Sequence, residues 1–264
     1  MPEQENDDYA FGLHTVAALL EQTPELIARL WVQSNPRNDR LAEIFGAARA
    51  AGVRVESVER RWLDQKLGRG KNHQGVLALQ QMRELADSDA LLAHVKTALQ
   101  EDPTKVLVLI LDEVQDAGNL GACLRSADGA GVTAVVVPKR RSAPINSLAR
   151  RTAAGAAESQ FIAGVTNLVR TIEALQELGV WVYSASDSAQ IAYTQADFTA
   201  PCALVLGNEE RGVRRLVAER CDGQVSLPMS GTVASLNVSV ASGILLYEVL
   251  RQRTHVASSL QSDD

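Results

Sequence analysis

The stretch KVLVLILDEV, residues 105–114, decides the fold of this chain. Its unbroken apolar run has the length of a strand and is typical of one covered by helices on both faces. Further strand-like runs follow it: AVVVP, VWVYSAS, CALVLGN and QVSLPM. Helical patterns intervene at about 119–130, 145–157, 166–178, 210–219 and 235–253. This alternation predicts a mostly parallel α/β sheet over 104–254, with ligands bound beyond the carboxyl ends of the strands.

A smaller α/β module of about 70 residues precedes this sheet. GLHTVAALLEQ and RNDRLAEIFGAARAAG have helical spacing, whereas IARLWVQ, VRVESV and GVLALQQM have the pattern of strands. Between the two regions, a surface helix is expected from Asp87 to Gln100. The predicted organisation is therefore a module at 9–82, a linker at 83–103, a main domain at 104–254 and flexible tails at 1–8 and 255–264.

Composition is that of a soluble globular protein, with 46% hydrophobic and 22% charged residues among 264. The N-terminus, MPEQENDDYA, is too polar for a signal peptide, and no apolar run is long enough for a membrane span. We therefore expect a cytoplasmic protein. The three cysteines form no CxxC or Cys/His cluster, which favours buried thiols over disulfides or a metal site.

The net charge of −6 is concentrated in the two ends of the chain. The segments 1–8 and 263–264 carry six carboxylates and no cation, so residues 9–262 are formally neutral. Within them, RRWLDQKLGRGK (60–71) and KRRSAPINSLARR (139–151) are basic. Each is either a solvated loop or a surface that contacts phosphates. The candidate RNA contacts are Arg69, Lys71, Lys139, Arg140, Arg141 and Arg150.

Three predicted strands end in polar turns that contain glycine. The first turn carries Asn119 and Arg125, which are either site residues or a helix cap and a surface cation. The second carries Gly207, which permits close backbone approach, and Glu209, which suits a helix N-terminus, a ligand or a pairing with Arg125. The third, LPMSGTVASLN, has more hydroxyls than one helix cap requires, and Asn237 falls beyond the expected cap.

Several enzyme classes lack their motifs in this chain. There is no Walker lysine motif, no GxGxxG after a strand and no GxSxG elbow, and none of the four histidines lies in the three turns. These absences count against an NTPase, a dinucleotide-dependent enzyme and a serine–histidine hydrolase.

Three segments, in order, resemble the motifs of the SpoU-type (TrmH-like) RNA 2′-O-ribose methyltransferases of the SPOUT superfamily. They are NLGACLRSADGAG (119–131), LVLGNEERGV (204–213) and SLPMSGTVASLNVSVASGILLYEVLRQR (226–253). FGLHTVAALL and NHQGVLAL resemble the family's small RNA-binding module, which is similar to ribosomal L30e. The resemblance spans about 9–254 and is greatest to members that methylate a guanosine in the peptidyl-transferase P loop of 23S rRNA.

This resemblance implies a parallel sheet with a deep C-terminal trefoil knot, a homodimer with active sites near the subunit interface, and RNA as substrate. It implies S-adenosylmethionine as the cofactor, bound mainly by backbone atoms at Gly207, Leu227, Met229 and Leu236. Matching site residues are Asn119, Arg125, Glu209, Ser235 and Asn237. Relatives often have Pro and His where this chain has Ala117 and Gly118, so a looser turn is expected before Asn119.

The implied reaction transfers a methyl group to a ribose 2′-oxygen. The chain must align the reacting groups and help to deprotonate a weakly acidic hydroxyl. Because a guanidinium stays protonated in proteins, Arg125 suits electrostatic stabilisation better than literal base catalysis, and an RNA phosphate could accept the proton. Three alternatives remain: the same chemistry on a tRNA or another rRNA nucleotide, an inactive RNA-binding protein, and a small-molecule α/β enzyme such as a dehydrogenase.

Overall fold

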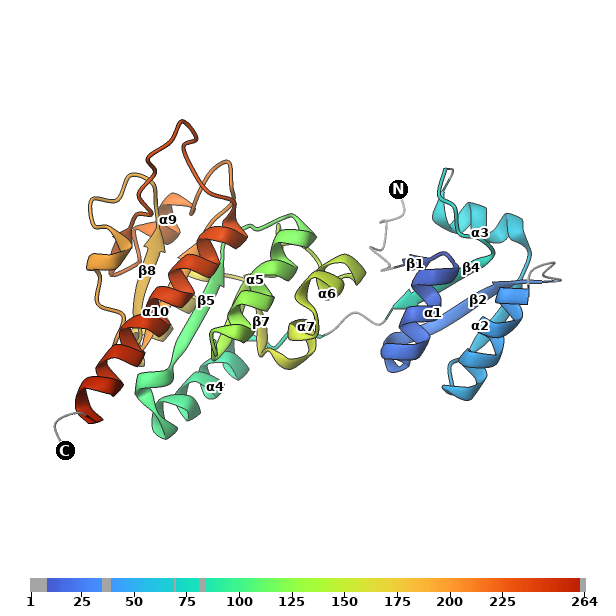
Figure 1. The fold of residues 1–264 in the computed structure, drawn as a ribbon, viewed down its shortest axis with the longest axis horizontal. Helices are drawn as coiled ribbons and strands as arrows, with labels where there is room; N and C mark the ends of the chain where they lie inside the picture. The colour runs from blue at the N-terminus through green and yellow to red at the C-terminus, as the bar shows by residue number, and fades with distance from the viewer. Residues whose placement is uncertain (1–8, 35–38, 69, 81–83, 262–264) are drawn as a thin grey trace. The chain divides into compact units, whose positions relative to one another are not determined.

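The computed structural model describes residues 9–34, 39–68, 70–80 and 84–261. The chain divides into two compact units, Met1–Arg83 and Glu84–Asp264, and each is described by itself (Figure 1). Among the described residues, none of the helices combines the length and the apolar character that a membrane span requires.

The first unit is a four-stranded sheet of order β1-β4-β2-β3, in which only β2 and β3 are parallel. Its elements are β1 (Tyr9–Phe11), α1 (Leu13–Gln22), η1 (Pro24–Leu26), β2 (Ile27–Gln33), α2 (Asp39–Ala50), β3 (Val55–Val58), α3 (Arg60–Leu67) and β4 (Val76–Gln80). Successive side chains of β2 point to opposite faces of the sheet. Leu30 and Val32 pack with side chains of α1 and α2 on one face, whereas Trp31 packs with Leu63 of α3 on the other. The sequence missed β1 and α3, which are short.

The second unit is a six-stranded, entirely parallel sheet of order β10-β8-β9-β5-β6-β7. Its strands are β5 (Leu107–Leu111), β6 (Ala134–Pro138), β7 (Ile162–Val165), β8 (Trp181–Ala185), β9 (Cys202–Leu206) and β10 (Gly223–Val225). The predicted parallel sheet is confirmed, and β7 is an addition. Strand order does not report whether the chain passes through one of its own loops. The trefoil knot therefore stays a prediction.

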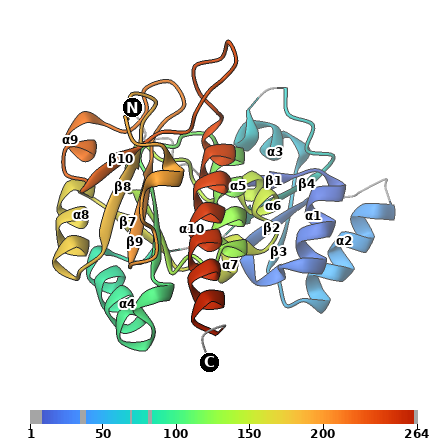
Figure 2. The ribbon, with the colours of Figure 1, turned by 60° about the vertical axis from the view of Figure 1, so that its left-hand side comes forward.

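Helices cover both faces of this sheet (Figures 1 and 2). They are α4 (Ser88–Glu101), η2 (Pro103–Lys105), α5 (Ala117–Gly129), α6 (Ser147–Ala153), α7 (Ala156–Ser159), α8 (Leu168–Glu177), η3 (Tyr193–Gln195), α9 (Arg215–Ala218) and α10 (Val238–Gln261). Leu109 and Leu111 of β5 join one core with residues of α5 and α10. Val108 and Ile110 join the opposite core with residues of α4 and α8. The continuous apolar run of β5 is explained by this burial on both faces.

Four boundary predictions need correction. The supposed linker 83–103 contains α4, whose Leu91 and Val95 are fully buried in the core of the second unit. The helix predicted at 145–157 is two helices, because Ala154 and Gly155 take left-handed conformations with φ of 52° and 98°. The helix predicted at 210–219 shrinks to α9, since a hairpin occupies its first half. Finally, α10 begins later than residue 235 and continues to Gln261, so the predicted tail at 255–264 is largely helical.

Candidate active site

A cavity of about 430 Å³ lies at the carboxyl ends of β8, β9 and β10. All four predicted cofactor contacts line it, namely Gly207, Leu227, Met229 and Leu236. Glu209 and Ser235 line it as well. The second and third motifs therefore meet at this one cavity, at the strand ends where parallel α/β sheets bind ligands.

Gly207 allows the backbone after β9 to fold tightly on itself. A Cβ atom at this position would lie 2.0 Å from the carbonyl carbon of Gly212 and 2.2 Å from the nitrogen of Val213. The loop closes as a hairpin, in which the Asn208 nitrogen donates to the Gly212 oxygen at 3.1 Å and the Gly212 nitrogen donates back at 2.7 Å. Any side chain at position 207 would therefore force the hairpin to move.

The first motif joins the site through a chain of side-chain hydrogen bonds. Asn119 donates from Nδ2 to Oε1 of Glu209, and Asn237 donates from Nδ2 to Oδ1 of Asn119 at 3.0 Å. The chain thus joins the start of α5, the hairpin after β9 and the start of α10. Glu209 was expected near a helix N-terminus, on a ligand or beside Arg125. It lies in the hairpin, six residues before α9 begins, where it lines the cavity and its side-chain partner is Asn119.

Local capping holds both asparagines in place. The Asn119 backbone nitrogen donates to Oδ1 of Asp116 at 2.7 Å, which caps α5 and leaves the Asn119 side chain to make other bonds. Asp116 thus closes the turn that Ala117 and Gly118 were expected to loosen. Asn237, which the sequence placed past the cap, is the residue just before α10, and its Oδ1 accepts from the Ser239 nitrogen at 2.9 Å.

Three predicted site residues do not line the cavity: Asn119, Asn237 and Arg125. The two asparagines are joined to it through Glu209, whereas Arg125 lies elsewhere on α5. It is exposed on α5 and is not part of the cavity lining. Six residues along a helix correspond to about 240° of rotation and about 9 Å of rise, so Arg125 and Asn119 face different directions.

The candidate RNA contacts differ in their environments. Lys71, Lys139 and Arg140 are exposed. Arg141 is 73% exposed and pairs with Glu113 at 3.4 Å. Arg150 needs correction: it is only 9% exposed, and its guanidinium bonds the Ile145 carbonyl oxygen and pairs with Glu158, so its role is structural. Arg69 lies outside the described residues.

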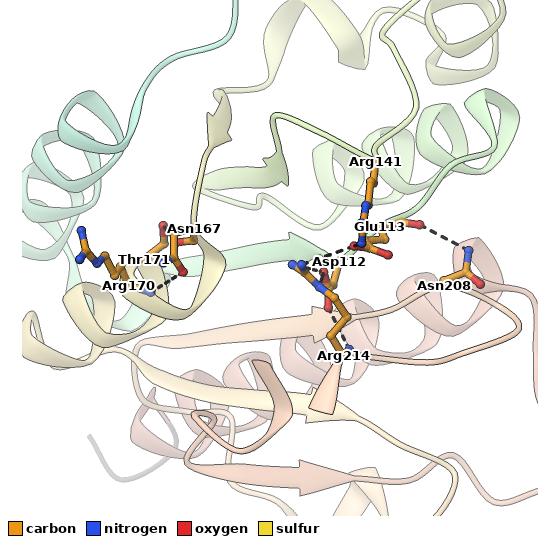
Figure 3. A network of polar contacts seen from close by, with 8 residues as sticks. All are labelled: Asp112, Glu113, Arg141, Asn167, Arg170, Thr171, Asn208 and Arg214. Carbon is orange, nitrogen blue, oxygen red and sulfur yellow. Dashed lines mark hydrogen bonds and ion pairs between the residues drawn. The ribbon is translucent and has the colours of Figure 1, made fainter. Parts of the chain in front are cut away.

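The sequence missed an ion pair beside the hairpin (Figure 3). Asp112 follows β5 and is fully buried, and its Oδ1 lies 2.7 Å from Nη2 of Arg214. Burial raises the pKa of Asp112, whereas the hydrogen bonds and charge of Arg214 oppose that rise. The position of Asp112 directly after a buried strand was a usable signal, because ligand sites gather there; nothing in the sequence pointed to Arg214.

The cavity fits the implied cofactor. Its volume is within the range of small-molecule sites. Its charged lining residues are Asp187, Glu209, Glu210 and Arg211, and this excess of carboxylates favours a ligand that bears positive charge, such as a sulfonium. Asp187 and its neighbours Ser186 and Ser188 were also missed by the sequence. Within the described ranges, no group of three or more His, Cys, Asp or Glu residues could hold a metal ion.

Comparisons with known proteins match both units of the chain. Residues 106–247 match the model of the SpoU rRNA methylase family, and residues 9–86 match the RNA 2′-O-ribose methyltransferase substrate-binding model. The 23S rRNA (guanosine-2′-O-)-methyltransferase RlmB of Vibrio parahaemolyticus is 44% identical over 252 residues, covering 94% of this chain and 98% of that protein. The Escherichia coli K12 protein of the same name is 43% identical, with coverages of 92% and 98%.

Solved structures show the same fold. The SpoU methyltransferase AviRb from Streptomyces viridochromogenes, in complex with the cofactor AdoMet, has a TM-score of 0.63 at 22% identity and covers 94% of this chain and 90% of that one. An AdoMet-bound rRNA methyltransferase from Sinorhizobium meliloti has a TM-score of 0.63 at 24% identity, with coverages of 93% and 87%. These neighbours confirm the predicted fold class.

The family model covers more than half of the chain, and the full-length relatives exceed 40% identity. The predicted enzyme class, an RNA 2′-O-ribose methyltransferase that uses S-adenosylmethionine, is thereby confirmed: the chain belongs to the SpoU rRNA methylase family.

Proposed function

We propose that this protein methylates the ribose 2′-oxygen of a guanosine in 23S rRNA, within the peptidyl-transferase P loop, and that it acts in the cytoplasm. The RlmB relatives, which are similar over nearly their whole length, support the guanosine and the 23S rRNA. The P loop rests on the sequence resemblance alone. The observation that carries the catalytic assignment is the chain of hydrogen bonds from Asn237 through Asn119 to Glu209 at the edge of the cavity.

S-adenosylmethionine supplies an activated methyl group when it is bound. The residues of this chain then have two tasks. Asn119, Glu209 and Asn237 form a rigid polar edge that orients the ribose, and Ser235 adds a hydroxyl to the cavity wall. Arg125 stabilises the alkoxide that develops on the 2′-oxygen and lowers the pKa of that hydroxyl, and an RNA phosphate accepts the proton.

The exposure of Arg125 leads to a proposal about assembly. Val240 and Tyr247 of α10 are 49% and 56% exposed, and α10 packs beside α5. Residues seven apart share one helix face, so these two form an apolar surface beside the helix that carries Arg125. We propose that two copies pair through α5 and α10, and that Arg125 of each copy completes the site of the other.

Methylation mapping tests the substrate. We expect the purified protein to methylate one guanosine ribose in a 23S rRNA fragment that contains the P loop. Transfer of tritium from labelled S-adenosylmethionine and primer-extension stops would locate the modified nucleotide. Modification of tRNA instead, or of another 23S position, would replace this substrate assignment.

Mixing inactive variants tests the composite site. Arg125→Ala and Glu209→Ala should each be inactive, because each lacks one half of every site. Random co-assembly should restore about a quarter of wild-type activity, since half of the dimers then hold one intact site. The matched control mixes Asn119→Ala with Glu209→Ala, both on the same side of the site, and should restore nothing. Equal results from the two mixtures would rule out a shared site.

A further inference from the structure

We propose that the ion pair of buried Asp112 with Arg214 positions the hairpin 208–212, and so sets the affinity for the methyl donor. This inference rests on the proposed function of the cavity and adds two residues to it. The hairpin carries Glu209 and lines one wall of the cavity.

Both ends of the hairpin are tied to the two consecutive residues that follow β5. At its far end, the Arg214 backbone nitrogen donates to Oδ2 of Asp112 at 2.9 Å, and Arg214 Nε donates to Oδ1 at 2.8 Å (Figure 3). At its near end, Asn208 Nδ2 donates to the Glu113 carbonyl oxygen at 3.4 Å. Residues 112 and 113 thus anchor a loop about 100 positions away in sequence.

The anchor itself is firmly held. The Asp112 nitrogen donates to the Leu206 oxygen at 2.7 Å, which extends the pairing of β5 with β9 by one residue. Glu113 has φ of 59°, a left-handed conformation that residues with a Cβ avoid unless their surroundings hold them there. Its carboxylate accepts from Arg141 and pairs with Arg214, each at 3.4 Å.

The number of contacts that Arg214 makes explains why this residue is an arginine. Its backbone nitrogen and two of its guanidinium nitrogens contact the Asp112 carboxylate, and the third guanidinium nitrogen, Nη1, pairs with Glu113. A lysine keeps the charge but provides a single compact ammonium that cannot span both carboxylates. Arg214→Lys should therefore loosen the hairpin. It keeps a positive charge beside the buried carboxylate of Asp112.

Calorimetry with S-adenosylmethionine tests the proposal on the full chain. We expect Arg214→Lys to raise the Kd of the donor about tenfold, with the thermal unfolding midpoint close to that of the wild type. The matched control is Arg215→Lys, because Arg215 is the adjacent exposed arginine and pairs with Glu219, four residues further along the chain, at 2.6 Å. Its donor affinity should not change.

Two further readouts separate positioning from general stability. Hydrogen exchange should accelerate in peptides covering 207–213 in Arg214→Lys but not in Arg215→Lys. The KM for the donor should rise, whereas the KM for RNA should not. Asp112→Asn should show the same pattern, and if it does not fold, Arg214→Lys alone decides. Unchanged donor affinity and exchange in Arg214→Lys would overturn the proposal; failure of the wild type to bind donor would instead overturn the proposed function.

Discussion

Asn119 and Asn237, 118 residues apart in the chain, are joined by a hydrogen bond of 3.0 Å from Nδ2 of Asn237 to Oδ1 of Asn119. Each amide also serves a second partner: Asn119 donates to Glu209, and Asn237 caps α10 through Ser239. A side-chain amide can donate and accept hydrogen bonds at once, whereas an ionised carboxylate only accepts them and an apolar side chain does neither. An amide at each position can therefore serve both of its partners.

Removing the central amide should affect turnover more than donor binding. We expect Asn119→Ala to lower kcat about 10²-fold, because Glu209 and Asn237 lose their shared partner and the ribose loses its alignment. Donor affinity, measured by calorimetry, should stay at the wild-type value, since Asn119 does not line the cavity. Asn167→Ala is the control. It removes the N-terminal cap of α8, in which the Arg170 nitrogen donates to Oδ1 of Asn167. It should cost about 1 kcal/mol of stability but no activity.

A side chain at position 207 should close the donor site. In Gly207→Ala, the new Cβ would overlap the Gly212 backbone, so the hairpin must move and the Kd for S-adenosylmethionine should rise at least about tenfold. Gly46→Ala is the control, because a Cβ at this position in α2 meets nothing within 4 Å, and it should stabilise the helix slightly. Wild-type donor affinity in Gly207→Ala would show that the hairpin does not form the donor site.

The exposed cations after β6 should account for part of the salt dependence of RNA binding. We expect Lys139→Ala with Arg140→Ala to reduce the slope of log K against log salt by about 1.4, or about 0.7 for each lost contact to single-stranded RNA. The control pair, Lys96→Ala with Arg170→Ala, removes two exposed cations from α4 and α8 on the other face of the sheet. Filter binding over a range of salt concentrations measures the slopes, and equal slopes for the two pairs would refute this RNA contact.

The buried thiols should make the protein less stable at alkaline pH. Burial raises the pKa of Cys123 to about 12 and that of Cys202 to about 11, whereas a thiol in the unfolded chain titrates near about 8.5. Between about pH 8.5 and 11 the unfolded state therefore releases protons that the folded state keeps. The free energy of unfolding should fall by about 1.4 kcal/mol per pH unit for each thiol in that window, and should show no such slope below it.

Urea unfolding at pH 8, 9 and 10 measures this slope. Other groups titrate in the same range, so the comparison is with Cys123→Ala and Cys202→Ala together, whose lost packing lowers stability equally at every pH. The double variant should have the shallower slope. Parallel slopes for the two proteins would mean that the thiols do not titrate differently on unfolding.

The sequence determined much of this protein by itself. Because β5 is covered on both faces, its residues 107–111 are uniformly apolar, and the parallel sheet could be predicted from that run. Small and polar residues at the ends of strands indicated a ligand site there, and the resemblance to the family indicated Gly207, Leu227 and Leu236 as its cofactor contacts. Motifs in the right order indicated the family and its chemistry.

Only the tertiary structure decided which side chains actually meet. Hydrogen bonds between Asn119, Glu209 and Asn237, and the ion pair of Asp112 with Arg214, join positions 90 to 118 residues apart. Local periodicity reports which face of an element is buried, but carries no information on partners at such separations. The same limit explains why Arg150, basic in sequence, is buried, and why Arg125 lies outside the cavity lining. Side-chain direction follows from helix rotation and packing, which the whole fold sets.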